Sequence, residues 1–231
     1  MHRRAFVPLG VVLIGGAAAN LHAGVVDFTI TADNHYAIYN GVGPGVGGAP
    51  VVSFIGMNES GPTGDPGEYN WSLPEVWQFE NTTGEIFIAA WSDDSIAQAL
   101  LAQVNAGAKP LHSGNAAWSV YPTGLDLDDF DLRPTEGQMA AFIQTATTGG
   151  LWEVPYVGGV NGVGPWSLVP GITTDARWTW WNRPGDPNPL DGGTGDGEFI
   201  IFRLMTLTIP TPGAIPLALA AIGLASRRRR H

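Results

Sequence analysis

The chain contains no cysteine among its 231 residues. It therefore has no disulfide framework, no thiolate metal site and no cysteine nucleophile. Charged residues are also few, at 14%, while hydrophobic residues reach 44%, which excludes the polar, highly charged composition of disordered chains. With 32 glycines and 18 prolines, the sequence does not suit a frame of long helices, and a packed domain rich in turns is expected.

Basic residues are scarce between the two ends of the chain. Residues 24–208 hold five of them against all 21 acidic residues, which gives this body a net charge of −16. Such a body repels phosphate backbones, so nucleic acid is not expected as a partner. Cations and neutral polymers fit the charge better.

The N-terminus has the layout of an export signal. Arg3 and Arg4 precede an apolar run at residues 5–19, and small residues then lead to a cleavage site after Ala23. This pattern predicts a signal peptide at residues 1–23 and export of the rest. The two arginines also partly resemble a twin-arginine signal, which leaves the export route open. The alternative is an uncleaved anchor, although the apolar run is shorter than the ~20 residues of a spanning helix.

The C-terminus, residues 209–231, places a proline turn before a short apolar stretch and a run of arginines. The residues that define this order are Pro210, Pro212, Gly213, Arg227, Arg228, Arg229 and Arg230. The order resembles the PEP-CTERM sorting signal of exported bacterial proteins, although Thr211 stands where that family has a glutamate. A plain tail anchor is the alternative.

The PEP-CTERM resemblance implies a destination and partners. In that family an exosortase-type sorting machinery recognises and processes the tail at the membrane, in bacteria that commonly make exopolysaccharide. The apolar sorting helix would contact the membrane transiently, because residues 214–225 reach only about 18 Å as a helix, against a hydrocarbon core of ~30 Å. The expected location is the cell envelope, the cell surface or the extracellular matrix.

Short segments rich in β-formers recur between glycine and proline clusters throughout residues 24–208. They are residues 25–31, 37–39, 51–55, 76–79, 85–91, 117–121, 177–181 and 198–209. This spacing predicts a β-sandwich or barrel in one domain. In the first segment, alternation of polar and apolar residues puts Phe28 and Ile30 on the core face.

Two segments carry a helical pattern. The first follows a cap at Asp94 or Ser95 and ends at Gly107, with apolar residues at helical spacing between them. The second follows a cap at Thr135 and ends at Gly149 and Gly150. The apolar residues expected on the two helix faces are Ile96, Leu100, Leu101 and Val104 in the first, and Met139, Phe142, Ile143 and Ala146 in the second.

Several motifs of the body resemble galactose-binding-like jelly rolls. Residues 31–41 read Thr-Ala-Asp-Asn-His-Tyr-Ala-Ile-Tyr-Asn-Gly, and the segments around Trp118, Trp166 and Trp178 resemble later tryptophan-bearing parts of that family. The resemblance implies a sandwich that binds glycans or supports other modules, with no catalytic residue. The expected fold is therefore all-β: a jelly-roll-like β-sandwich with two short helices, flanked by a signal peptide and an apolar sorting helix.

The nine tryptophans all lie inside the body, and sugar rings stack on exposed aromatic rings. The strand period puts Trp178 and Trp180 on one face and Arg177 and Trp181 on the other. Trp166 and Trp181 stand beside proline and glycine turns, where we expect exposure. We therefore predict a glycan-binding site formed by Trp166, Trp181 and Arg177; the alternative is that these tryptophans pack internally.

A glycine-rich loop concentrates oxygen ligands of the kind that Ca²⁺ prefers. The predicted ligands are Asp186, Asn188, Asp191, Asp196 and Glu198. Their spacing is not that of an EF-hand. A structural Ca²⁺ and a solvated loop are the two interpretations.

Enzyme motifs are missing from the sequence. It has no G-x-S-x-G elbow, no Walker loop and no H-E-x-x-H, and His35 and His112 are the only histidines of the body, too few for a three-histidine zinc site. The leading hypothesis is an exported, non-catalytic protein of the cell surface or exopolysaccharide that binds glycans through exposed aromatics. The alternative is a structural matrix or envelope protein with cation-mediated packing, and a remote alternative is a glycoside hydrolase, for which no pair of carboxylates is singled out.

Overall fold

The structure is a computed structural model that describes residues 24–42, 50–58, 73–81, 85–92, 97–105, 110–127, 131–164, 166–191 and 198–205. The predicted signal peptide at residues 1–23 and the predicted sorting segment at residues 209–231 lie outside these ranges. Within them, no helix has the length and hydropathy that crossing a membrane requires.

The first of two sheets has six strands. Its strands, in spatial order, are β4 (Glu75–Asn81), β1 (Gly24–Asp33), β6 (Ala99–Asn105), β10 (Arg177–Trp180) and β9 (Tyr156–Val160), with the short β7 (Leu111–His112) also paired to β6. Every pair in this sheet is antiparallel.

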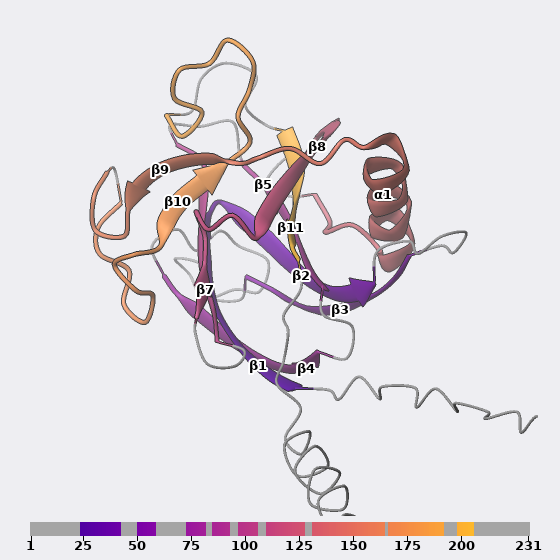
Figure 1. The fold of residues 1–231 in the computed structure, drawn as a ribbon, viewed down its shortest axis with the longest axis horizontal. Coiled ribbons are helices and arrows are strands. Elements are labelled where there is room, and N and C mark those ends of the chain that lie inside the picture. Colours follow the sequence, from indigo (N-terminus) through magenta and orange to yellow (C-terminus); the bar gives the residue numbers. More distant parts are fainter. Residues whose placement is uncertain are drawn as a thin grey trace, which may run out of the picture.

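The second sheet is also antiparallel throughout. Its strands, in spatial order, are β3 (Val51–Met57), β2 (His35–Val42), β5 (Glu85–Trp91), β11 (Glu198–Leu204) and β8 (Trp118–Asp126). A core that draws residues from both sheets fills the space between them. The predicted β-sandwich is thus confirmed at the level of two antiparallel sheets, as Figure 1 shows.

The predicted inward faces are confirmed where the strands alternate. Phe28 and Ile30 of β1 are fully buried in the core between the sheets. Trp178 and Trp180 of β10 are buried in the same core, and the Trp180 ring meets Phe202 of the second sheet edge to face at 6.2 Å. The period of two therefore orients these side chains correctly.

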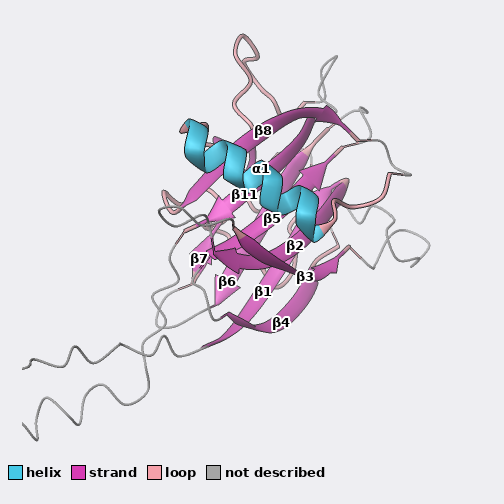
Figure 2. Cartoon of the chain, turned by 90° about the vertical axis from the view of Figure 1, so that its right-hand side faces the viewer, coloured by secondary structure: helices cyan, strands magenta, loops and turns pink. Residues whose placement is uncertain are grey.

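Helix α1 (Glu136–Gly149) confirms the second predicted helix. Thr135 and Gln138 form a capping box, and Gly150 ends the helix in the left-handed conformation at φ 64°. Met139, Ile143 and Ala146 form one buried stripe that packs against the second sheet. Figure 2 shows α1 lying across the outer face of that sheet, so the protein has three layers.

The prediction of a helix that ends at Gly107 is wrong, because strand β6 occupies most of its range. Leu100, Leu101 and Val104 belong to a strand that pairs with β1 over seven residues and with β10 on its other side. Nearly every residue of β6 is buried, so the strand shows a continuous apolar run in place of alternation. The caps expected at Asp94 or Ser95 lie outside the described residues.

Several strands differ from the expected segments in their boundaries or were not expected at all. The strand expected at residues 117–121 begins one residue later and continues to Asp126. The strand expected at residues 198–209 is β11, which ends at Leu204, and residues 206–209 lie outside the described part of the chain. Strands β7 and β9 were not expected, the second because its Gly158–Gly159 pair is atypical of a strand interior.

Side chains from three elements fix the beginning of α1 on the second sheet. The Tyr39 hydroxyl donates to the carbonyl of Pro134, and the backbone N–H of Phe54 donates to Glu136 Oε1 at 2.8 Å. The Arg133 guanidinium lies over the Phe54 ring, 3.5 Å from its centroid. Burial raises the pKa of Tyr39 above its ordinary value, while the nearby Arg133 opposes this shift.

Removing the cap should weaken the whole fold. We expect Thr135→Ala to lower the free energy of unfolding by about 1 kcal/mol, because the backbone N–H of Gln138 loses its acceptor, the Thr135 hydroxyl. The matched control is Thr145→Ala, an exposed position inside the same helix, where alanine changes stability by less than about 0.5 kcal/mol. Urea denaturation measures both, and equal effects would contradict the capping role.

The raised pKa of Tyr39 gives stability a pH dependence. The folded state holds the phenolic proton more tightly than the unfolded state, so this contribution is complete below about pH 10 and is lost as pH rises through the folded pKa. We expect Tyr39→Phe to remove that part of the decline. The measurement is the free energy of unfolding of both chains between about pH 8 and about pH 11; parallel curves would show that Tyr39 does not contribute.

Candidate functional site

The strand registers define two ends of the sandwich. Strand β1 begins at Gly24, opposite Asn81, and strand β11 ends at Leu204, opposite Ile86. Asn81 ends β4 and Ile86 lies at the start of β5, so β1 begins and β11 ends at the same end of the sandwich. The ten residues of β1 lead to the opposite end, about 30 Å away at the usual strand rise. In Figure 1 the loop after β10 lies at the top of the molecule and β1 begins at the bottom.

A cavity of about 460 Å³ lies at the end remote from Gly24 and Leu204. Strand β9, the loops after β9 and β10, and the residue two before β6 form it. Its described lining residues are Ala97, Tyr156, Gly158, Gly159, Gly164, Asn188, Leu190 and Asp191. The volume falls in the range of about 300–1,000 Å³ that is typical of small-molecule sites.

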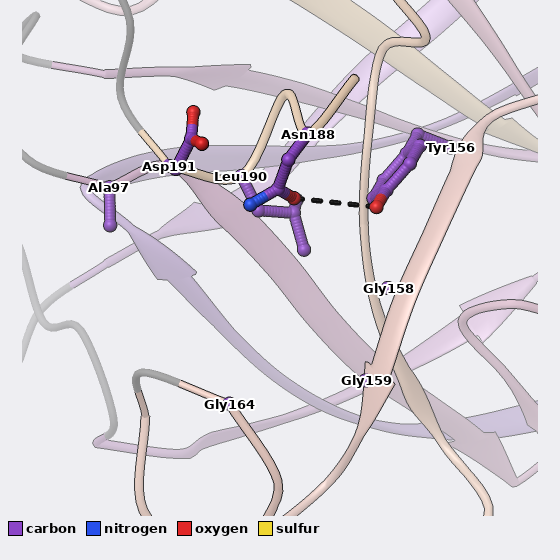
Figure 3. Close-up of a pocket in the computed structure, with 8 residues that line it drawn as sticks. All are labelled: Ala97, Tyr156, Gly158, Gly159, Gly164, Asn188, Leu190 and Asp191. Atoms are coloured by element: carbon purple, nitrogen blue, oxygen red, sulfur yellow. Dashed lines mark hydrogen bonds between the residues drawn. The ribbon is translucent and has the colours of Figure 1, made fainter.

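Hydrogen bonds hold the loop after β10 in place over β9. The Tyr156 hydroxyl donates to Asn188 Oδ1 at 3.3 Å, which Figure 3 shows as a bond across the cavity. The Gln98 amide donates to the carbonyl of Pro189 at 3.1 Å, and Gln98 itself is buried. The Asn188 backbone N–H donates to Asp186 Oδ1 at 2.9 Å. The Asn188 side chain is therefore presented by a turn that is fixed from both sides.

Glycine shapes the wall of the cavity. A Cβ on Gly158 would lie 2.3 Å from Leu190 Cδ1, and one on Gly159 would lie 2.7 Å from the carbonyl oxygen of Val163. A side chain at Gly159 would displace the backbone at Val163, whereas one at Gly158 would displace the Leu190 side chain. The bare backbone of β9 therefore faces the cavity, beside the Leu190 side chain, which Figure 3 shows directed toward Gly158.

The structure does not bring the three predicted glycan-binding residues together in this cavity. Trp166 is only 3% exposed, its ring stacks on Trp178 at 4.2 Å, and its Nε1–H donates to Asp33 Oδ2 at 2.9 Å. The expectation that Trp166 is exposed is therefore wrong. Asn161, also buried, causes this by bonding the backbone of the loop that carries Trp166, at Val169 and Ile172.

Trp181 and Arg177 lie near β9 without lining the cavity. Trp181 is half-buried, packs against the core and donates from Nε1 to Glu153 Oε2 at 3.0 Å. Arg177 is exposed, and its guanidinium donates to the carbonyl of Gly158 at 3.1 Å. All eight described tryptophans are buried or half-buried, so none of them is fully exposed.

The predicted cation ligands are only partly described. Asp186 bonds the turn, Asn188 bonds Tyr156, and Asp191 lies exposed at the edge of the cavity. Asp196 and the side chain of Glu198 lie outside the described residues. Within the part of the chain that the structure describes, no three histidine, aspartate or glutamate side chains gather as metal ligands. The Ca²⁺ site stays a prediction.

Sequence reasoning reached Asn188 and Asp191 but missed the other residues of the cavity. Tyr156, Gly158 and Gly159 lie on the strand that was not expected, and Leu190 and Ala97 resemble ordinary apolar residues in the sequence. The available signal is the run Tyr156–Val160, where two glycines interrupt an apolar segment. A glycine inside a strand marks a close approach of backbone or ligand.

The burial of Trp166 can be tested by a comparison of two tryptophans. We expect Trp166→Ala to lower the free energy of unfolding by about 3–5 kcal/mol, because a fully packed aromatic ring is lost. Trp181→Ala, at a half-buried position, should cost less than half as much. Equilibrium denaturation of the two variants decides the point, and a smaller loss for Trp166→Ala than for Trp181→Ala would contradict the assignment.

Comparison with family models, with curated proteins and with solved structures finds no match for this chain. The interpretation of the site therefore depends on its own geometry and chemistry.

Proposed function

We propose that this protein is exported, is non-catalytic, and binds glycan at the cell surface or in the exopolysaccharide layer. The observation that carries the proposal is the open cavity beside Tyr156. It combines an aromatic ring, a fixed amide at Asn188, apolar side chains and bare glycine backbone. Sugars are recognised by such a mixture, since ring C–H groups contact apolar surface and hydroxyls bond amides and carbonyls.

The destination in this proposal comes from the two ends of the sequence. Residues 1–23 act as a signal peptide, and residues 209–231 act as a PEP-CTERM-like signal for an exosortase-type machinery, with transient membrane contact. Support comes from the strand registers, because the chain leaves β11 at the end remote from the cavity. A tail held at the membrane would then leave the cavity facing outward.

The finer fold assignment belongs to the same proposal. We take the two sheets as a jelly-roll-like sandwich related to the galactose-binding-like domains, on the resemblance of residues 31–41. The order of strands supports it: β1 and β2 follow one another in sequence but lie in different sheets, as do β4 and β5. A structural Ca²⁺ in the loop after β10 completes the proposal.

A second candidate function, a matrix or envelope protein with cation-mediated packing, is favoured by the buried tryptophans. Aromatic residues that serve only the core are what a structural role needs, and the described tryptophans are buried or half-buried. The glycoside hydrolase is less favoured, because Asp191 is the one carboxylate among the described residues of the cavity lining and hydrolysis needs two.

The test is binding of the full-length chain to a panel of bacterial and algal polysaccharides, with Ca²⁺ and with a chelator. We expect Asn188→Ala to weaken binding roughly tenfold, the effect of losing about 1.4 kcal/mol of hydrogen bonding. The matched control is Asn182→Ala, an exposed asparagine of the same loop that does not line the cavity. Tyr156→Phe keeps the ring and removes the hydroxyl that holds Asn188.

Two results would count against glycan binding in the cavity. If no polysaccharide binds in either condition and the chain self-associates with Ca²⁺, the matrix function replaces it. If Asn182→Ala weakens binding as much as Asn188→Ala, the ligand contacts another part of the loop.

A further inference from the structure

Apart from the Asp191 carboxylate, the polar groups among the described lining residues are neutral. They are the Tyr156 hydroxyl, the Asn188 amide and the peptide groups of Gly158, Gly159 and Gly164. Each can exchange hydrogen bonds with a hydroxyl, because the set contains both N–H or O–H donors and carbonyl acceptors. None of the described lining groups is a cation, which a carboxylate or sulfate group requires when it leaves water.

The cavity lining also has an apolar part. Ala97 and Leu190 contribute their methyl groups, and the glycines contribute Cα atoms without side chains. Figure 3 shows the Leu190 side chain between Asn188 and Gly158. A ligand in this cavity therefore contacts both hydrocarbon and hydrogen-bonding groups.

The charged groups near the cavity do not form an ion site. Asp191 is exposed, and Figure 3 shows its carboxylate turned away from the glycines. The Arg177 guanidinium does not line the cavity among the described residues and is held on the carbonyl of Gly158. The net charge of −16 for residues 24–208 repels an anionic polymer before it reaches the cavity.

We infer that the cavity selects uncharged, hydroxyl-bearing sugar units and discriminates against uronic acids and sulfated sugars. This inference rests on the proposed glycan binding and names the chemical class of its ligand. A uronate carboxylate inside the cavity would lose hydration without gaining a cation. A neutral hexose loses only hydroxyl hydration, which the Asn188 amide and the glycine peptide groups replace.

The experiment compares matched pairs of polymers with the same backbone. The full-length chain is titrated with neutral glucan, galactan and mannan, each beside its C6-oxidised polyuronate. For the polymer that binds, we expect the neutral member to bind at least about tenfold more tightly than the uronate. We also expect affinity for the neutral member to change less than about twofold between low and high salt, because no ion pair contributes.

Variants separate this inference from the function on which it rests. Asn188→Ala should lower affinity for the neutral member, whereas Asn182→Ala should leave it unchanged. Equal binding of a neutral polymer and its uronate, with affinity falling at high salt, overturns the neutral selectivity and leaves glycan binding standing. If no neutral or oxidised polymer binds at all, the proposed function fails and the selectivity fails with it.

Discussion

Strand β5 has to bury both of its faces, and the three layers of the protein follow from that requirement. Ile86, Ile88 and Ala90 face the core between the sheets, while Phe87, Ala89 and Trp91 face the helix side. A sheet with such strands at its centre exposes apolar surface unless a second element covers it. Helix α1 supplies that cover, so its cap and its contacts at Tyr39 matter to the whole sandwich.

The sequence predicted those elements whose local signals agree with their surroundings. In α1, the cap at Thr135, the apolar stripe and Gly150 all indicate the same helix. The run that became β6 lacks such agreement, because a strand buried on both faces has the same apolar composition as a buried helix. Its seven-residue pairing with β1, from a distant part of the chain, decided between them.

The residues of the candidate site were likewise predicted only in part. Asn188 and Asp191 were recognisable because polar residues in a glycine-rich loop stand out in a sequence. Tyr156 and Gly158 were not, because their role depends on β9 lying beside β10 and beneath Leu190. Trp166 was assigned to the surface from its neighbouring turns, yet the bonds of Asn161 bring its loop back onto the core. Long-range hydrogen bonds of this kind have no local signature.

The placement of β11 also determines how the protein carries mechanical load. The strand lies between β5 and β8 and pairs with both, and the described chain leaves it at the end remote from the cavity. Tension applied along β11 would load its ladders with both neighbouring strands at once. The hydrogen bonds of an antiparallel ladder are perpendicular to the strands, so this tension shears both ladders together and does not open them one bond at a time.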